Sequence, residues 1–229
     1  MKYLRTVRMA AITGLLALIF SCGLDVFIYL HPVTYRDFVP SQDPLFNYFS
    51  FLTSDSRNHN DAADYFKGFE IYYRIYNNSG TAATDRSQIN QYNEDNPYLA
   101  YNYIINTKNY RRLLTSERTS TPLITGATTN RQVTVRLVPY VDEVPSMYVD
   151  TTYLGVPRRN VDDGIYSDAA IFDFEEINDG DSDVSWSTWN DTNNKQLYVQ
   201  AYVLAYGYDE SYKQLYSELF YLGFITLEE

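Results

Sequence analysis

Apolar and polar residues alternate along several stretches of this chain, which is the pattern of β-strands with one buried face. Residues 66–76 (FKGFEIYYRIY) are the clearest case, with Phe, Ile and Tyr at the odd positions from 69 to 75. Residues 197–207 (LYVQAYVLAYG) alternate Leu, Val and Ala with mainly Tyr. Both stretches predict strands whose second, tyrosine-bearing face is partly wetted, since Tyr has an apolar body and a polar tip.

Further strands are predicted wherever shorter stretches show a similar pattern. They are residues 25–30, 44–53, 110–115, 131–138, 146–156, 169–177 and 215–227. Strands of this number and length, separated by turn-rich segments, favour an all-β fold. We therefore predict an antiparallel two-sheet sandwich with long loops.

The segments between these strands are polar. Residues 54–64 and 77–96 are predicted as loops, whereas Asn96-Pro97 is typical of a helix start and predicts one short helix near residues 97–107. Residues 22–229 are expected to form a single domain. Two small β domains that divide near residue 140 are the alternative.

The N-terminus has the organisation of a secretory signal. Lys2, Arg5 and Arg8 precede an apolar stretch at residues 9–20. That stretch is shorter than the roughly 20 residues that a membrane-spanning helix needs. The only cysteine of the chain, Cys22, follows directly.

Ile19-Phe20-Ser21-Cys22 resembles a bacterial lipobox. The resemblance implies that residues 1–21 are a lipoprotein signal peptide and that Cys22 carries fatty acyl chains such as palmitate. Each buried CH₂ contributes about 0.8 kcal/mol, so two or more chains anchor a protein stably to a lipid bilayer. The implied location is the cell envelope, on the periplasmic or surface face of a bacterial membrane. An ordinary thiol after a conventional cleavage site is the alternative.

Two broader resemblances concern the body of the chain. Residues 197–227 look like the final hairpin of a fibronectin type III-like, or immunoglobulin-like, β-sandwich, and residues 45–51 and 69–76 are similar to its B and C strands. Cys22-Gly23-Leu24 followed by FKGFEIYYRIY resembles Tyr-rich spirochaetal envelope lipoproteins of unassigned role. The second resemblance implies an envelope-anchored accessory protein and transfers no functional residues.

Composition excludes several classes of protein. A net charge of -11 and a pI near 4.6 argue against a nucleic-acid partner, because phosphate neutralisation needs clustered Lys and Arg. One cysteine cannot form a disulfide scaffold. The two histidines, His31 and His59, are far apart and accompany no catalytic motif. The sequence therefore predicts neither an enzyme nor a bound cofactor, apart from the calcium alternative that follows.

One acidic cluster has a spacing that suits calcium. Asp179, Asp181 and Asp183 alternate in the segment NDGDSD, and such carboxylates can wrap around Ca²⁺. The glycine and the glutamate that an EF-hand needs are missing at their positions. A weak Ca²⁺ site and a solvated acidic loop both remain open.

Aromatic residues are the best candidates for a binding surface. Trp186 and Trp189 follow the acidic cluster, and Tyr198, Tyr202 and Tyr206 share one face of the strand predicted at residues 197–207. Tyr offers large, rigid contact area at low entropic cost. The alternatives are one core and one rim tryptophan, and tyrosines that merely fill the outer positions of the strand. The sequence thus predicts a lipid-anchored binding or structural module for a protein or a glycan. A carbohydrate-active enzyme that uses an Asp/Glu pair near residues 173–191 is the alternative.

Overall fold

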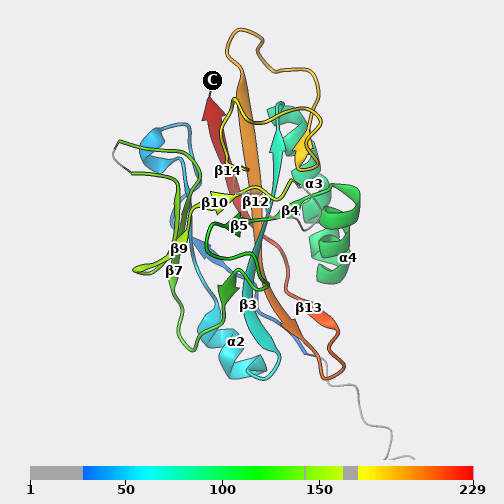
Figure 1. Ribbon diagram of the computed structural model, residues 1–229. Helices are drawn as coiled ribbons and strands as arrows, with labels where there is room; N and C mark the ends of the chain where they lie inside the picture. Colours follow the sequence, from blue (N-terminus) through cyan, green and yellow to red (C-terminus); the bar gives the residue numbers. More distant parts are fainter. Residues whose placement is uncertain (1–27, 142, 162–169, 229) are drawn as a thin grey trace, which may run out of the picture.

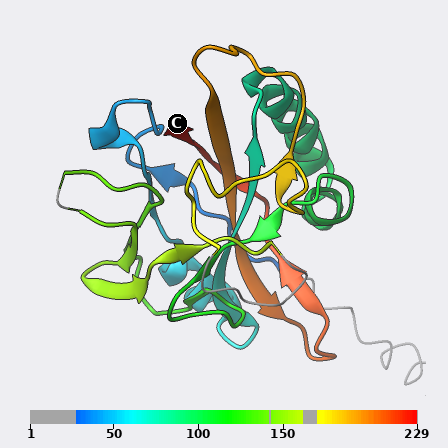
Figure 2. The same ribbon diagram turned by 45° about the horizontal axis from the view of Figure 1, so that its top comes forward.

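The computed structural model describes residues 28–141, 143–161 and 170–228 (Figure 1). They form a mostly β structure in which two antiparallel sheets pack in a sandwich-like arrangement, and helices cover the outer face of the larger sheet (Figure 2). The predicted signal segment and Cys22 lie outside the described residues.

Two long antiparallel strands form the centre of the larger sheet. β3 (Phe66–Tyr76) and β12 (Gln196–Tyr208) pair along almost their whole length. The other edge of β12 pairs with β13 (Gln214–Tyr216) and β14 (Phe220–Glu228). The other edge of β3 pairs with three two-residue strands, of which the last is parallel: β4 (Arg111–Arg112), β6 (Ile124–Thr125) and β11 (Val184–Ser185).

The smaller sheet has five antiparallel strands. Their spatial order is β1 (Tyr35–Arg36), β2 (Phe49–Leu52), β7 (Gln132–Arg136), β8 (Ser146–Val149) and β9 (Thr152–Gly155). A separate pair joins β5 (Leu114–Thr115) to β10 (Pro157–Arg158). Both main sheets contain strands from before and after residue 140, so a boundary there would cut through each of them.

The predicted helix near residues 97–107 is confirmed. It consists of α4 (Pro97–Asn102) and a π-helical turn at Tyr103–Thr107. Asn96 caps it, with its side-chain oxygen accepting a hydrogen bond from the backbone N–H of Tyr98 at 2.8 Å.

The loop predictions for residues 54–64 and 77–96 are wrong, because each segment contains a helix. α2 (Asp55–Ala62) buries two polar residues, Asp55 and Asn58, beside Ala62. α3 (Ser79–Asp95) buries only Ala82, Asp85 and Ile89. Buried faces that are this narrow and this polar leave no clear hydrophobic period in the sequence. A short 3₁₀ turn at Pro44–Phe46 likewise precedes β2.

Two segments predicted as strands do not form them in their described parts. Residues 28–30 and residues 170–177 have no strand, and the second segment contains a turn. In that turn the Asp173 carboxylate accepts a hydrogen bond from the backbone N–H of Glu175 at 3.0 Å. A side chain that bonds the backbone two residues further on favours a turn over a strand.

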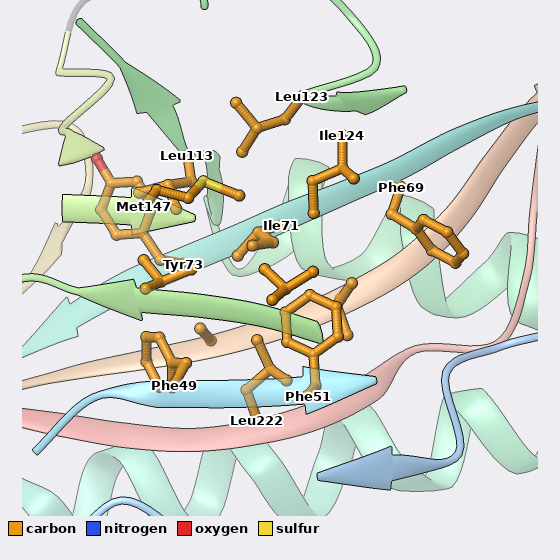
Figure 3. Packing of buried hydrophobic residues seen from close by; sticks show 14 of the residues in the cluster. Phe49, Phe51, Phe69, Ile71, Tyr73, Leu113, Leu123, Ile124, Met147 and Leu222 are labelled. Atoms are coloured by element: carbon orange, nitrogen blue, oxygen red, sulfur yellow. The ribbon is translucent and has the colours of Figure 1, made fainter. Parts of the chain in front are cut away.

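The main core lies between the two sheets (Figure 3). Phe49 and Phe51 of β2 and Met147 of β8 face Ile71 and Tyr73 of β3. The apolar faces predicted for β3 and β12 are confirmed, since the odd-numbered residues 69–75 and 197–205 all belong to this core.

The opposite face of the larger sheet is also buried. Tyr198, Tyr202 and Tyr206 of β12 are only 9%, 1% and 2% exposed, beneath a layer that includes Ile89 of α3 and Ala100 of α4. The prediction of a partly wetted tyrosine face is therefore wrong for these residues. The unpredicted helix α3 and the predicted helix α4 cover this face, which therefore forms a second core.

The buried tyrosines differ in how their hydroxyl groups are satisfied. The Tyr76 hydroxyl donates to Asp85 at 2.9 Å and lies 3.2 Å from the Tyr110 hydroxyl. The Tyr202 hydroxyl is buried and has no hydrogen-bond partner in the described part of the chain. A buried hydroxyl without a partner carries a desolvation cost that no bond offsets.

This difference gives a matched pair of variants. Tyr202→Phe is expected to leave the free energy of unfolding unchanged or to raise it, because it removes an unsatisfied hydroxyl. Tyr76→Phe is expected to lower it by about 1–3 kcal/mol, because it breaks a bond to a carboxylate. Urea unfolding of both variants measures the contrast, and equal losses would contradict it.

Candidate functional site

The acidic cluster is tied to a buried arginine. The Arg159 guanidinium lies 2.6 Å from Asp181 and 2.6 Å from Asp183, and Asp183 is fully buried. The Tyr73 hydroxyl also donates to Asp183 at 2.7 Å. Two of the three predicted Ca²⁺ ligands thus serve an internal ion pair, while Asp179 is exposed in the adjoining turn. Within the described ranges, no three His, Cys, Asp or Glu side chains are grouped to hold a metal.

The two tryptophans pack against each other. Their rings lie edge to face with centroids 5.0 Å apart. Trp189 is half-buried, with Phe174 at 6.3 Å and the Lys195 ammonium at 5.8 Å from its ring centroid. Trp186 is 39% exposed. With Tyr198, Tyr202 and Tyr206 buried, Trp186 is the most exposed of the five aromatic residues that the sequence singled out for binding.

The outer face of the smaller sheet carries a hollow that the sequence did not reveal. We call it the tyrosine hollow; its volume is about 750 Å³. Besides Val144, three kinds of side chain line it: the tyrosines, the hydroxyl residues Thr134 and Ser146, and charged groups. The tyrosines and charged groups are Tyr48, Tyr148, Tyr153, Arg136, Glu143 and Asp150.

Strand alternation places these side chains outside. Val133 and Val135 of β7 point into the core, so Thr134 and Arg136 point away from it. In β8, Met147 and Val149 are in the core, so that the hydroxyl of Ser146 and the ring of Tyr148 face the hollow.

Tyr148 and Tyr153 form an exposed aromatic pair. They lie opposite each other on β8 and β9, and their ring centroids are 5.3 Å apart at an angle of 53°. The rings are exposed because no helix formed by the described residues covers this face, and the two residues retain 39% and 45% of their accessible surface. Exposed, paired rings on a rigid sheet provide flat apolar contact area for a ligand.

Arg136 fixes one end of the hollow. Its guanidinium lies 4.6 Å from the Tyr48 ring centroid and 5.2 Å from that of Tyr140. It also donates to the Pro44 carbonyl at 3.1 Å and pairs with Glu143 at 3.0 Å. These contacts hold a cation in place beside the aromatic surface, so that little side-chain entropy is lost on binding.

Sequence reasoning missed this site although a signal for it exists. The strand predicted at residues 131–138 carries Thr134 and Arg136 on the face opposite to Val133 and Val135, which marks them as outward. Two tyrosines flank the turn at residues 150–151, and a tight hairpin there brings them together. That pairing depends on the register of β8 with β9, which the sequence alone does not specify.

One further carboxylate is buried at a distance in the chain from both the acidic cluster and the tyrosine hollow. Glu70 of β3 is completely inaccessible; it lies 3.5 Å from Arg112 and accepts a hydrogen bond from the backbone N–H of Leu123 at 3.2 Å. Its second oxygen has no partner in the described part of the chain. Burial raises the pKa of Glu70 to about 7, against the smaller opposing effect of Arg112.

Glu70 should therefore make stability depend on pH. Its pKa in the folded state exceeds the ordinary value of 4.5, so the folded state binds more protons between those values and stability falls as pH rises from 4.5 to about 7. The loss is on the order of 3 kcal/mol. Glu70→Gln is expected to remove it. Urea unfolding at pH 4.5, 6 and 8 tests this, with the exposed Glu175→Gln as control; parallel pH curves for wild type and Glu70→Gln would contradict it.

No helix in the described ranges combines the length and the apolar character needed to cross a membrane. Comparison with protein-family models, with curated proteins and with solved structures found no match to this chain.

Proposed function

We propose that this protein is a lipid-anchored protein of the bacterial cell envelope that binds a glycan at the tyrosine hollow. The observation that carries the proposal is the exposed Tyr148–Tyr153 pair beside fixed polar groups. The partner class follows from the chemistry of this surface, and the anchor follows from the lipobox resemblance at Cys22.

A glycan can interact with both the aromatic and the polar side chains of this surface. A sugar ring has an apolar C–H face that packs against an aromatic ring, and its hydroxyl groups bond to side chains such as Thr134, Ser146 and Asp150. The volume of about 750 Å³ lies within the usual range for small-ligand sites. A protein partner needs about 800 Å² of complementary surface on each side, which a local concave hollow matches less well.

The position of the hollow supports a tethered binder. The first described residues lie near α2, where His31 contacts Asp61 at 2.6 Å. β2 leads from the Tyr48 end of the hollow to α2, so the length of this strand separates that end from the first described residues. In this proposal the anchor at Cys22 precedes those residues in the chain and leaves the hollow free to bind.

The finer fold assignment is also a proposal. Two packed antiparallel sheets support a fibronectin type III-like relation, and the helical layer on β3 and β12 is an addition to that plan. We do not propose the carbohydrate-active enzyme, because Asp181 and Asp183, from the acidic region that it would use, are paired with Arg159.

Glycan binding is tested by removing the two exposed rings. Tyr148→Ala combined with Tyr153→Ala is expected to weaken binding of a glycan selected on an array by at least about 30-fold, since paired aromatic anchors each contribute strongly. Titration calorimetry measures the loss. Tyr98→Ala, an exposed tyrosine on α4, is the control and should bind normally. Equal affinity of the double variant and wild type would refute the site.

The anchor is tested separately. Cys22→Ser is expected to move the protein from the detergent phase to the aqueous phase in Triton X-114 partitioning and to remove the lipid mass from the mature N-terminus, because the acyl chains are attached to that sulfur. Mass spectrometry reads the second change. Unaltered partitioning would contradict lipid anchoring and leave the glycan site to be judged by its own test.

A further inference from the structure

A second hollow lies at the end of the sandwich that carries the C-terminal strand end. We call it the end cavity; its volume is about 380 Å³. Its walls are mainly apolar, with Leu137, Val138, Ile171 and Leu227 beside a group of rigid rings. These rings are Pro44, Pro139, Pro145, Pro157, Phe172 and Phe174.

The end cavity and the tyrosine hollow have no lining residue in common. Neighbouring residues of one hairpin line different hollows: Arg136 and Ser146 line the tyrosine hollow, whereas Leu137 and Pro145 line the end cavity. The two hollows are therefore separate sites with different walls, one polar and aromatic, the other apolar.

Hydrogen bonds hold the end cavity in shape. The buried Asn47 side chain donates to the Thr226 carbonyl at 2.8 Å and accepts from the Thr226 backbone N–H at 3.0 Å, which links the start of β2 to β14. The Pro44 carbonyl is bonded to Arg136. Because proline also fixes its own backbone angle, the cavity is preorganised and a ligand has little structure to order on binding.

The charge of the lining has one sign. Among the described residues, Asp173 and Glu228 are its ionisable groups, both are exposed, and no Lys, Arg or His lines the cavity. Each carboxylate accepts one hydrogen bond, from the Glu175 backbone and the Gln196 side chain. No ion pair joins either carboxylate to a cation within the described residues. A net charge of -11 adds to the attraction for cations.

We propose that the end cavity binds a small ligand that combines an apolar body with a protonated amine. The apolar body packs against the proline and phenylalanine walls, and the ammonium group lies beside Asp173 and Glu228. An apolar ligand without the positive charge loses the second interaction, and an anionic one is repelled.

Three ligands with the same alkyl chain separate these contributions. Octylamine, octanol and octanoate are titrated into the full chain at pH 7, below their aggregation concentrations, and followed by calorimetry. Octylamine is expected to bind about fivefold more tightly than octanol, which is the upper range for an exposed ion pair, and octanoate more weakly than either. Octanol or octanoate binding as tightly as octylamine, or no saturable binding by any of them, would overturn the proposal.

Two variants locate the site. Asp173→Asn with Glu228→Gln is expected to reduce octylamine affinity to that of octanol while octanol affinity stays constant. Glu94→Gln with Asp95→Asn makes the same charge change on α3 and should alter neither. Val138→Trp fills the cavity and should abolish binding of both ligands, with thermal unfolding as the check on folding. Unchanged octylamine affinity in the Asp173/Glu228 variant would refute the assignment.

Discussion

The pairing of β3 with β12 is the constraint on which the rest of the structure depends. Both strands are buried on both faces along most of their length, although an antiparallel sheet commonly leaves one face to solvent. The smaller sheet covers the face that carries Ile71 and Val199, and the helices cover the face that carries Tyr72 and Tyr202. A shift of one residue in this register would exchange the aliphatic and tyrosine faces and leave neither layer with its partner.

Part of the acidic charge of this protein lies inside the fold, where carboxylates accept hydrogen bonds from buried tyrosines. A hydrogen-bond partner offsets the cost of burying a phenol, and Asp85 supplies one for Tyr76 while pairing with Lys108 at 2.6 Å. On the opposite face of β3, Asp183 does the same for Tyr73 while pairing with Arg159. The carboxylate clusters that look like surface features in the sequence are in part internal partners of tyrosine and arginine. Other acids, such as Asp173 and Glu228 at the end cavity, lie at the surface without an ion pair among the described residues.

The sequence predicted the parts of the fold that depend on local pattern. Period-two alternation was sufficient for the core faces of β3 and β12, and Asn96-Pro97 was sufficient for the start of α4. The helices α2 and α3 were missed because their buried positions include Asp55, Asn58 and Asp85, which a hydrophobic pattern does not register. Each of these polar residues is satisfied by a partner from elsewhere in the chain, such as Arg131 for Asp55 at 2.9 Å. The local sequence does not reveal these partners, because only the tertiary fold brings them together.

The candidate sites also depend on tertiary pairing that the sequence alone does not specify. The outward side chains of β7 and β8 line the tyrosine hollow, and residues of the connection between these strands line the end cavity, so one hairpin supplies walls to two hollows. Thr134 and Tyr148 face a polar, aromatic hollow, while the connection places Leu137 and Pro145 in an apolar one. Local sequence sets the alternation, but only the pairing with β2 and β9 decides which side is solvent and which is enclosed. A register slip of one residue in β7 would therefore turn Thr134 and Arg136 toward the core and remove them from the tyrosine hollow.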